Sequence, residues 1–262
     1  MLLENSFVQF PSASSPWVNG RPPHIPFGPG RLPRVCLLPG DPERVNLAAQ
    51  VLDDFSILGN KREFRLGIGS YESRQIAICS TGIGGPSTEI SIIELFHLGV
   101  RTFIRVGGMG SLNLDIRPGA LTYVSSVVAN SGAAKHYRFD QEPLSASPEL
   151  VTEIQRVALE QKLKVFPITA MSSDSYYLGQ GRSIDRESKT DGDFLMRIKS
   201  QGIDAIEMEA ETIFAVSKRL DCTFGAILTT HGNRLSDEWL NDYESAQLRM
   251  LEFASCVASK FA

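Results

Sequence analysis

The chain has 262 residues, of which 42% are hydrophobic and 21% charged, and this suits one large domain, or two small ones, with an ample core. Its formal net charge of −4 argues against a polyanionic partner, so we expect no nucleic-acid and no membrane interface. The opening MLLENSFVQF lacks the basic start of a signal peptide, no apolar run is long enough to span a bilayer, and the four cysteines form no CxxC pair, so we expect a cytoplasmic protein.

The chain begins with a segment rich in Pro, Gly and Ser over residues 1–33, which we interpret as an extended arm. Beyond the arm, short apolar runs alternate with amphipathic stretches. We expect strands at 34–40, 75–81, 102–108, 120–128, 164–171, 205–208 and 222–230. We expect helices at 41–52, 86–99, 147–162, 192–202, 210–220 and over most of 237–261, the third of them opened by a serine N-cap.

Strands that are apolar throughout and alternate with helices indicate a sheet that is covered on both faces. No internal repeat and no linker divides the part of the chain that follows the arm. The sequence therefore predicts a single α/β domain over residues 34–262, preceded by the arm.

Three glycine-rich segments follow predicted strands, where ligands of such sheets collect. They are PGDPER at 39–44, STGIGGPST at 80–88 and RVGGMG at 105–110. Glycine turns at these points let backbone N–H groups approach an anion closely. Neither glycine-rich segment at 80–88 or 105–110 completes the dinucleotide fingerprint, and the four histidines are too dispersed to suggest a metal site, so we expect none.

Arg44 and Arg105 stand beside these glycine turns. An arginine fork matches the oxygens of phosphate, and each charge-assisted bond contributes roughly 1.5–3 kcal/mol. A different interpretation is open for each residue. Arg44 could be a solvated residue of the first helix, and Arg105 could form a buried ion pair with a core carboxylate.

Two further segments carry polar side chains with more than one interpretation. Glu207 and Glu209 lie where a strand passes into a helix, so they could cap that helix or grip the vicinal hydroxyls of a ribose. In SSDSYYLGQGRS at 172–183, the amide of Gln180 could pair with an N–H and a C=O of a base, and Arg182 could donate to a carbonyl. Taken alone, this segment could be any polar loop.

In their order and spacing, PGDPERV, CSTGIGGPST, LGVRTFIRVG, SSDSYYLGQGR and IEMEAET resemble the nucleoside phosphorylase superfamily, most of all its uridine phosphorylases. The resemblance covers the chain from about residue 23 to the C-terminus. It implies a twisted, mixed sheet flanked by helices, and dimers of which three form a hexamer. It also implies the phosphorolysis of a pyrimidine nucleoside, in which uridine and phosphate give uracil and ribose 1-phosphate. Inorganic phosphate is then a co-substrate, and no metal or organic cofactor is needed.

The resemblance also assigns the site residues. Phosphate would be bound by Gly40, Arg44, Arg105 and Gly108, with Arg62 lent by the neighbouring subunit. The ribose would be bound by Glu207, Met208 and Glu209, with His24 reaching across from the neighbouring subunit. The base would stack on Tyr176 and be read by Gln180 and Arg182. The catalytic set implied is Arg105, Glu209, Arg182 and Arg234.

Three positions depart from the family pattern. Gly108 stands where the family has a threonine or serine hydroxyl, which leaves open a nucleoside-binding homologue with weakened turnover. His231 and Gly232 replace aliphatic residues that line the base pocket, which leaves open a purine or broad-specificity phosphorylase. His231 could serve as a general acid towards a base nitrogen or could reshape the pocket.

Overall fold

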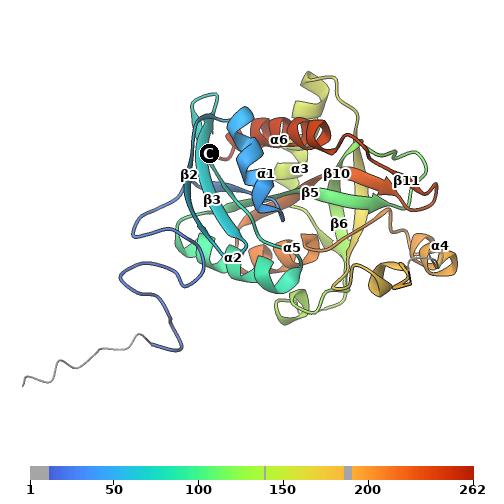
Figure 1. Ribbon diagram of the computed structural model, residues 1–262, viewed down its shortest axis with the longest axis horizontal. Helices are drawn as coiled ribbons and strands as arrows, with labels where there is room; N and C mark the ends of the chain where they lie inside the picture. Colours follow the sequence, from blue (N-terminus) through green and yellow to red (C-terminus); the bar gives the residue numbers. More distant parts are fainter. Residues whose placement is uncertain (1–11, 139, 186–190) are drawn as a thin grey trace, which may run out of the picture.

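The computed structural model describes residues 12–138, 140–185 and 191–262. Its strands form one mixed, 11-stranded sheet, drawn in Figure 1. The strands are β1 (Val35–Leu38), β2 (Asp53–Lys61), β3 (Phe64–Tyr71), β4 (Arg74–Cys79), β5 (Thr102–Ser111), β6 (Leu121–Val128), β7 (Leu144–Ser145), β8 (Val165–Ser172), β9 (Ala205–Glu207), β10 (Thr223–Asn233) and β11 (Glu238–Trp239).

The centre of the sheet closes on itself. Strand β10 pairs with β5 on one side and with β6 on the other, and β6, β8, β9 and β5 pair in succession to complete the ring. From β5 the sheet continues through β1, β4, β3 and β2. Because β4, β1, β5 and β10 are parallel, their carboxyl ends meet at one edge, which is where ligands of such sheets bind.

Helices cover both faces of the sheet (Figure 1), as the sequence predicts. Helices α1, α3 and α6 lie on one side of the sheet, and α2 and α5 lie on the other. Each side buries its own apolar core. The helices are α1 (Pro42–Leu47), α2 (Gly85–His97), α3 (Pro148–Glu160), α4 (Gly192–Ser200), α5 (Ala210–Arg219) and α6 (Tyr243–Ser259), with short 3₁₀ turns at Ala48–Gln50, Ala134–His136 and Leu178–Gln180.

Two helix predictions need correction. The helix expected at 41–52 is shorter, because α1 begins after the Asp41 cap and ends at Leu47, where a 3₁₀ turn follows. Ser147 occupies the N-cap position of α3 but does not cap it, because its Oγ accepts the backbone N–H of Phe224 at 2.9 Å. The serine therefore attaches the start of α3 to β10.

The glycine-rich segment at 105–110 is also different from the expected turn. It belongs to β5, which continues to Ser111 because it pairs with β10 and β9 over these residues. Its glycines make room for side chains. A Cβ on Gly107 would lie 2.9 Å from the Cζ of Arg105, so the bare backbone leaves space for the guanidinium.

The apolar periodicity of the sequence does not predict strands β2, β3, β7 and β11. The β2–β3 hairpin gives little apolar pattern because most side chains of β2 are exposed. The short strand β11 precedes α6, which begins at Tyr243 and covers most of 237–261, as predicted.

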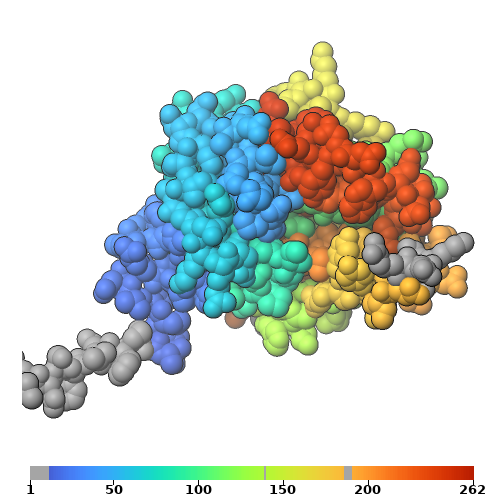
Figure 2. Space-filling model, viewed as in Figure 1, coloured from blue at the N-terminus to red at the C-terminus, as the bar shows by residue number. Residues whose placement is uncertain are grey.

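The described part of the arm lies against α2. The backbone N–H groups of His24 and Ile25 donate to Glu94 of α2, and Ile25 is 2% exposed. Figure 2 shows this segment (blue) along the side of the molecule that carries β2, β3 and α2. Within the described residues, no helix is both long enough and apolar enough to cross a membrane.

Candidate active site

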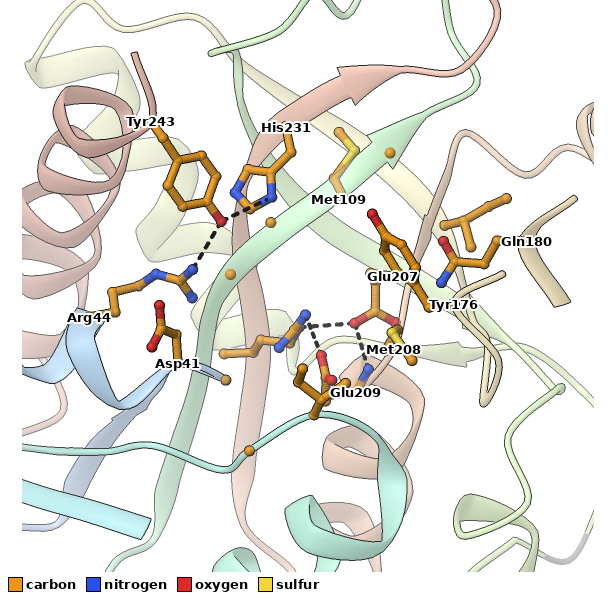
Figure 3. A pocket seen from close by; sticks show the side chains of 18 of the residues that line it. Asp41, Arg44, Met109, Tyr176, Gln180, Glu207, Met208, Glu209, His231 and Tyr243 are labelled. Atoms are coloured by element: carbon orange, nitrogen blue, oxygen red, sulfur yellow. Dashed lines mark hydrogen bonds and ion pairs between the residues drawn. The ribbon is translucent and has the colours of Figure 1, made fainter. Parts of the chain in front are cut away.

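A cavity of about 660 Å³ opens at the edge where the parallel strands end. Figure 3 shows its side chains converging from β5, β9, β10, α1, α6 and the loop before α4. Most residues predicted for the site line it: Gly40, Arg44, Arg105, Gly108, Tyr176, Gln180, Arg182, Glu207, Met208, Glu209 and His231.

Four predicted residues, Arg62, His24, Gly232 and Arg234, are not among the residues that line this cavity. Arg62 is exposed at the turn between β2 and β3. His24 lies in the arm, where its Nδ1 is 2.7 Å from Glu94 Oε1. Neither side chain is placed to serve the cavity of its own chain.

The other two, Gly232 and Arg234, lie behind the cavity wall. A Cβ on Gly232 would lie 2.8 Å from the ring of Trp239, and it is Trp239 that lines the cavity. Arg234 donates from Nη1 to the backbone carbonyl of Gln180 at 3.0 Å. Burial, assisted by the nearby Arg182 cation, lowers the pKa of Arg234 to about 10.

Arg44 is a buried cation whose hydrogen-bond partners are all neutral. It is 5% exposed, and it donates to Gln247 Oε1 at 2.5 Å, to the carbonyl of Val106 at 3.2 Å and to the Tyr243 hydroxyl at 3.3 Å. Burial lowers its pKa, which reflects the unfavourable desolvation of the charge. The interpretation of Arg44 as a solvated helix residue is therefore wrong.

Arg105 forms the buried ion pair that the sequence left open. Its Nε lies 2.9 Å from Glu207 Oε2, and its Nη2 lies 2.6 Å from Glu209 Oε2. All three side chains are at most 5% exposed. Because both carboxylates line the cavity, the pairs fix the guanidinium at the cavity surface.

The two glutamates differ in what their oxygens do. Glu207 caps α5, because its Oε2 accepts the backbone N–H groups of Glu209 and Ala210 at 2.8 Å each, and its Oε1 accepts the Ser172 hydroxyl. Glu209 makes no cap bond and instead accepts the N–H of Gly84 at 2.6 Å. Burial raises the pKa of Glu209, and the Arg105 guanidinium opposes that rise.

The opposite end of the cavity is built by a loop and the Leu178–Gln180 turn. The Nη1 of Arg182 donates to the Tyr176 carbonyl at 2.9 Å and to Gln180 Oε1 at 2.5 Å, and the guanidinium lies 4.0 Å from the centre of the Tyr176 ring. These bonds orient the Gln180 amide, so that its Nε2 is the donor turned away from Arg182. Tyr176 remains 42% exposed.

Sequence reasoning missed Tyr243 and Trp239, which both line the cavity. Tyr243 is the first residue of α6, and its hydroxyl contacts both Arg44 and His231. These partners are brought together only by the fold, so no local motif marks Tyr243. Trp239 follows the TTHGNR segment by five residues. A large aromatic residue so close to a polar motif is the one feature of the sequence that could have marked Trp239 as a cavity residue.

Known proteins are similar to this chain in sequence and in fold. Residues 34–259 match the family described as the phosphorylase superfamily. A guanosine phosphorylase of Halorubrum lacusprofundi is 32% identical over 80% of this chain and 83% of its own length. A uridine phosphorylase of Thermococcus kodakarensis is 33% identical over 88% of this chain and 84% of its own.

Solved structures give the same picture of the fold. A uridine phosphorylase of Vibrio fischeri superposes with a TM-score of 0.75 at 27% identity, covering 88% of this chain and 91% of that one. A purine nucleoside phosphorylase of Toxoplasma gondii has a TM-score of 0.77 at 23% identity, covering 87% and 91%. This second likeness bears on the fold alone.

Proposed function

The chain belongs to the phosphorylase superfamily, and from that premise we propose that it catalyses the phosphorolysis of a pyrimidine nucleoside. Uridine and phosphate would give uracil and ribose 1-phosphate, as the names of several relatives suggest. The observation that carries the proposal is Arg44, a buried guanidinium in the cavity wall whose hydrogen-bond partners are all neutral. A buried cation of this kind is stabilised when an anion binds beside it.

At the end of the cavity that Arg44 lines, Arg44 and Arg105 hold the attacking phosphate. Gly40 and Gly108 allow the backbone to approach it there. The two guanidiniums orient the nucleophile towards C1′ of the sugar. Positioning of this kind supplies several kcal/mol of the barrier reduction in intramolecular analogies. Arg105 also links phosphate to the sugar site, because Glu209, its partner, can accept hydroxyls of the ribose.

The sugar and the base would be held along the rest of the cavity. Met208 packs against the ribose beside Glu209, while Glu207 keeps Arg105 and the start of α5 in place. As the C1′–N bond breaks, negative charge grows on the base. Arg182 and the Gln180 amide stabilise that charge most strongly in the transition state, and Arg234 supports Gln180 from behind.

The Gln180 amide favours a base with an N–H next to a C=O. Its Nε2 donates to the carbonyl, and the remaining lone pair of its Oε1 accepts the N–H. Uracil has such an edge, whereas cytosine and adenine do not. Guanine and hypoxanthine also have it, and a guanosine phosphorylase is among the relatives. A 6-oxopurine nucleoside is therefore the second candidate substrate, as part of a purine or broad-specificity activity.

Uracil release from uridine, measured with and without phosphate, tests the proposal. We expect release only when phosphate, or arsenate in its place, is present. Equal release without either anion would identify a hydrolytic nucleosidase. Thermal stabilisation by nucleoside with no product would identify a binding protein without turnover. Guanosine and inosine in the same assay decide the second candidate, and cytidine and adenosine serve as controls that should react poorly.

The positions of His24 and Arg62 favour an oligomer with shared sites. Both residues lie outside the cavity of their own chain, so we propose that each serves a neighbouring subunit in a dimer-based hexamer. Mixing two inactive variants, Arg62→Ala and Arg105→Ala, tests this. Mixed dimers contain one site with both native arginines, so activity should return on subunit exchange. No recovery, with exchange verified, would contradict the shared site.

We also propose that phosphate is the only co-substrate, that no metal or organic cofactor takes part, and that the protein works in the cytoplasm. The chemistry supports the first two points, since arginines and an amide suffice to stabilise the charges on phosphate and base. The free state of all four cysteines supports a reducing compartment. Full activity after dialysis against a chelator would be the expected result.

A further inference from the structure

The two departures at Gly108 and His231 are one structural feature. A Cβ built on Gly108 would lie 1.8 Å from Cε1 of the His231 ring and 2.2 Å from each ring nitrogen. The polar edge of the imidazole therefore fills the volume that a side chain at position 108 would occupy. The ring can occupy this position only because residue 108 has no side chain.

A bulge in β10 directs the ring into that volume. Thr230 pairs with Met109 and Gly232 pairs with Gly110, so His231 is the extra residue between two register positions. Bulges of this kind re-aim a side chain next to a binding site. The side chain of His231 consequently lies against Gly108 of β5 and joins the cavity wall. Figure 3 shows its ring beside Tyr243.

A hydrogen-bond chain fixes which nitrogen of His231 carries the proton. Arg44 can only donate, so the Tyr243 oxygen accepts its Nη2–H at 3.3 Å. Burial raises the pKa of Tyr243, so the phenol keeps its own proton. The same hydroxyl is hydrogen-bonded to His231 Nδ1 at 3.1 Å, and we assign the phenol as the donor of this bond. The neutral ring then carries its proton on Nε2, which is buried and has no partner among the described residues.

The charged groups that face His231 are both cations. Burial, together with Arg44 of α1 and Arg105 of β5, lowers the pKa of His231 to about 3. The rings of Tyr243 in α6 and Trp239 in β11 also lie against the imidazole. Beside two guanidiniums, the ring is a neutral donor near neutral pH. An unpaired N–H between two cations is suited to an anionic oxygen.

We propose that His231 Nε2–H is a phosphate-binding donor of this enzyme, with the ring positioned by Tyr243 and seated in the space left by Gly108. The proposal rests on the proposed phosphorolysis for the identity of the anion. His231 thus supplies, from β10, the contact that a hydroxyl at position 108 of β5 would supply. Tyr243 is a positioning residue, since it acts on the anion only through His231 and Arg44.

The test compares three single variants with the wild type by their KM for phosphate and KM for uridine. His231→Ala should raise the KM for phosphate about tenfold or more and leave the KM for uridine within about twofold. His231→Gln, which keeps an N–H donor, should restore part of the affinity. His136 is an exposed histidine outside the cavity, so His136→Ala is the matched control. It should change neither the KM for phosphate nor the KM for uridine.

A pair of double variants separates the donor from the space it fills. Gly108→Ser/His231→Ala and Gly108→Ala/His231→Ala both refill the site, but only the first returns a hydroxyl. We expect recovery of the KM for phosphate in the serine variant and none in the alanine variant. Equal behaviour of the two would overturn the proposal, as would an unchanged KM for phosphate or a change confined to the KM for uridine in His231→Ala.

Failure of the proposed function is distinguishable from failure of this inference. If the wild-type protein shows no phosphate-dependent turnover, the Kd of inorganic phosphate, measured by calorimetry, replaces KM for every variant. A tenfold weaker Kd in His231→Ala than in wild type supports the donor, and an equal Kd, or no binding to wild type, overturns it. Thermal unfolding of each variant verifies that the fold is retained.

Discussion

The two ends of the cavity hold their arginines in different ways. Arg44 and Arg105 lie on α1 and β5, and their partners come from segments far apart in the chain, such as Gln247 and Glu209. Arg182 lies on a loop, and its partners Tyr176 and Gln180 are at most six residues away. The geometry of the proposed phosphate end therefore depends on the whole fold, whereas at the proposed base end Arg182 is held by its own loop.

This difference indicates which property is free to change. An altered loop at 173–182 can change the base that is accepted without disturbing the sheet. A change at Arg105 disturbs the sheet, the start of α5 and the glycine loop together. Relatives named for uridine and for guanosine match this chain at nearly the same identity, 33% and 32%, as expected when base choice is a local matter.

The largest effect is expected from Arg105→Ala. The variant loses a phosphate ligand and also leaves Glu207 and Glu209 as buried carboxylates without a cation. We expect turnover to fall about a thousandfold or more and the free energy of unfolding to fall by about 3–5 kcal/mol. Steady-state kinetics and urea denaturation measure the two effects. Wild-type turnover in this variant would contradict the phosphate assignment.

Arg44→Met should separate function from stability. Methionine keeps much of the side-chain volume, and no carboxylate hydrogen-bonded to Arg44 is left behind, since its partners are neutral. We expect the KM for phosphate to rise about a hundredfold while the free energy of unfolding changes by less than ~1 kcal/mol. A loss of stability as large as that of Arg105→Ala would show that the two arginines are not held differently.

Arg182→Ala tests the base end. Its partners lie on the same loop, so we expect a 10- to 100-fold fall in kcat/KM for uridine, an unchanged KM for phosphate and unfolding within about 0.5 kcal/mol of wild type. Initial rates with each substrate varied in turn, together with thermal unfolding, measure this. A raised KM for phosphate would break the separation of the two ends.

The smallest effect concerns pH. The pKa of His231 is lowered to about 3 in the folded protein, below the value near 6.5 of an unfolded chain. Between these values the unfolded state binds the extra proton, so His231 lowers stability as pH falls from 6.5 towards 3. For each unit by which pH falls in this range, the free energy of unfolding of the wild type should decrease by at most ~1.4 kcal/mol more than that of His231→Gln. Denaturant titrations at pH 5 and 7 measure this, with His136→Gln as control.

Much of the fold could be predicted because it rests on local patterns, and most of the cavity residues were assigned by the resemblance of their motifs to the nucleoside phosphorylase superfamily. Apolar strands that alternate with helices indicated the covered sheet, and glycine-rich segments after β1 and β4 marked the edge where the cavity opens. The β2–β3 hairpin was not predicted because most side chains of β2 are exposed, which leaves that strand without an apolar pattern. The sequence predicts a turn at the glycines of β5, because glycines beside Arg105 are equally typical of a turn and of a strand that leaves space for the guanidinium.

Pairings across the fold could not be read from the sequence. The seating of His231 over Gly108 depends on a bulge in β10, and the contact of Tyr243 with Arg44 joins residues 199 positions apart. Glu207 and Glu209 look equivalent in IEMEAET, yet one caps α5 and the other accepts the backbone N–H of Gly84. The sequence identified the residue types of the site, and the fold decided which of them act together.

The most direct test of the account is the product balance of the wild-type reaction at increasing phosphate. Phosphorus NMR measures ribose 1-phosphate, and absorbance measures uracil, in the same sample of protein and uridine. The account predicts one ribose 1-phosphate for each uracil, at a rate that extrapolates to zero without phosphate. Uracil accompanied by free ribose, at a rate independent of phosphate, would contradict it.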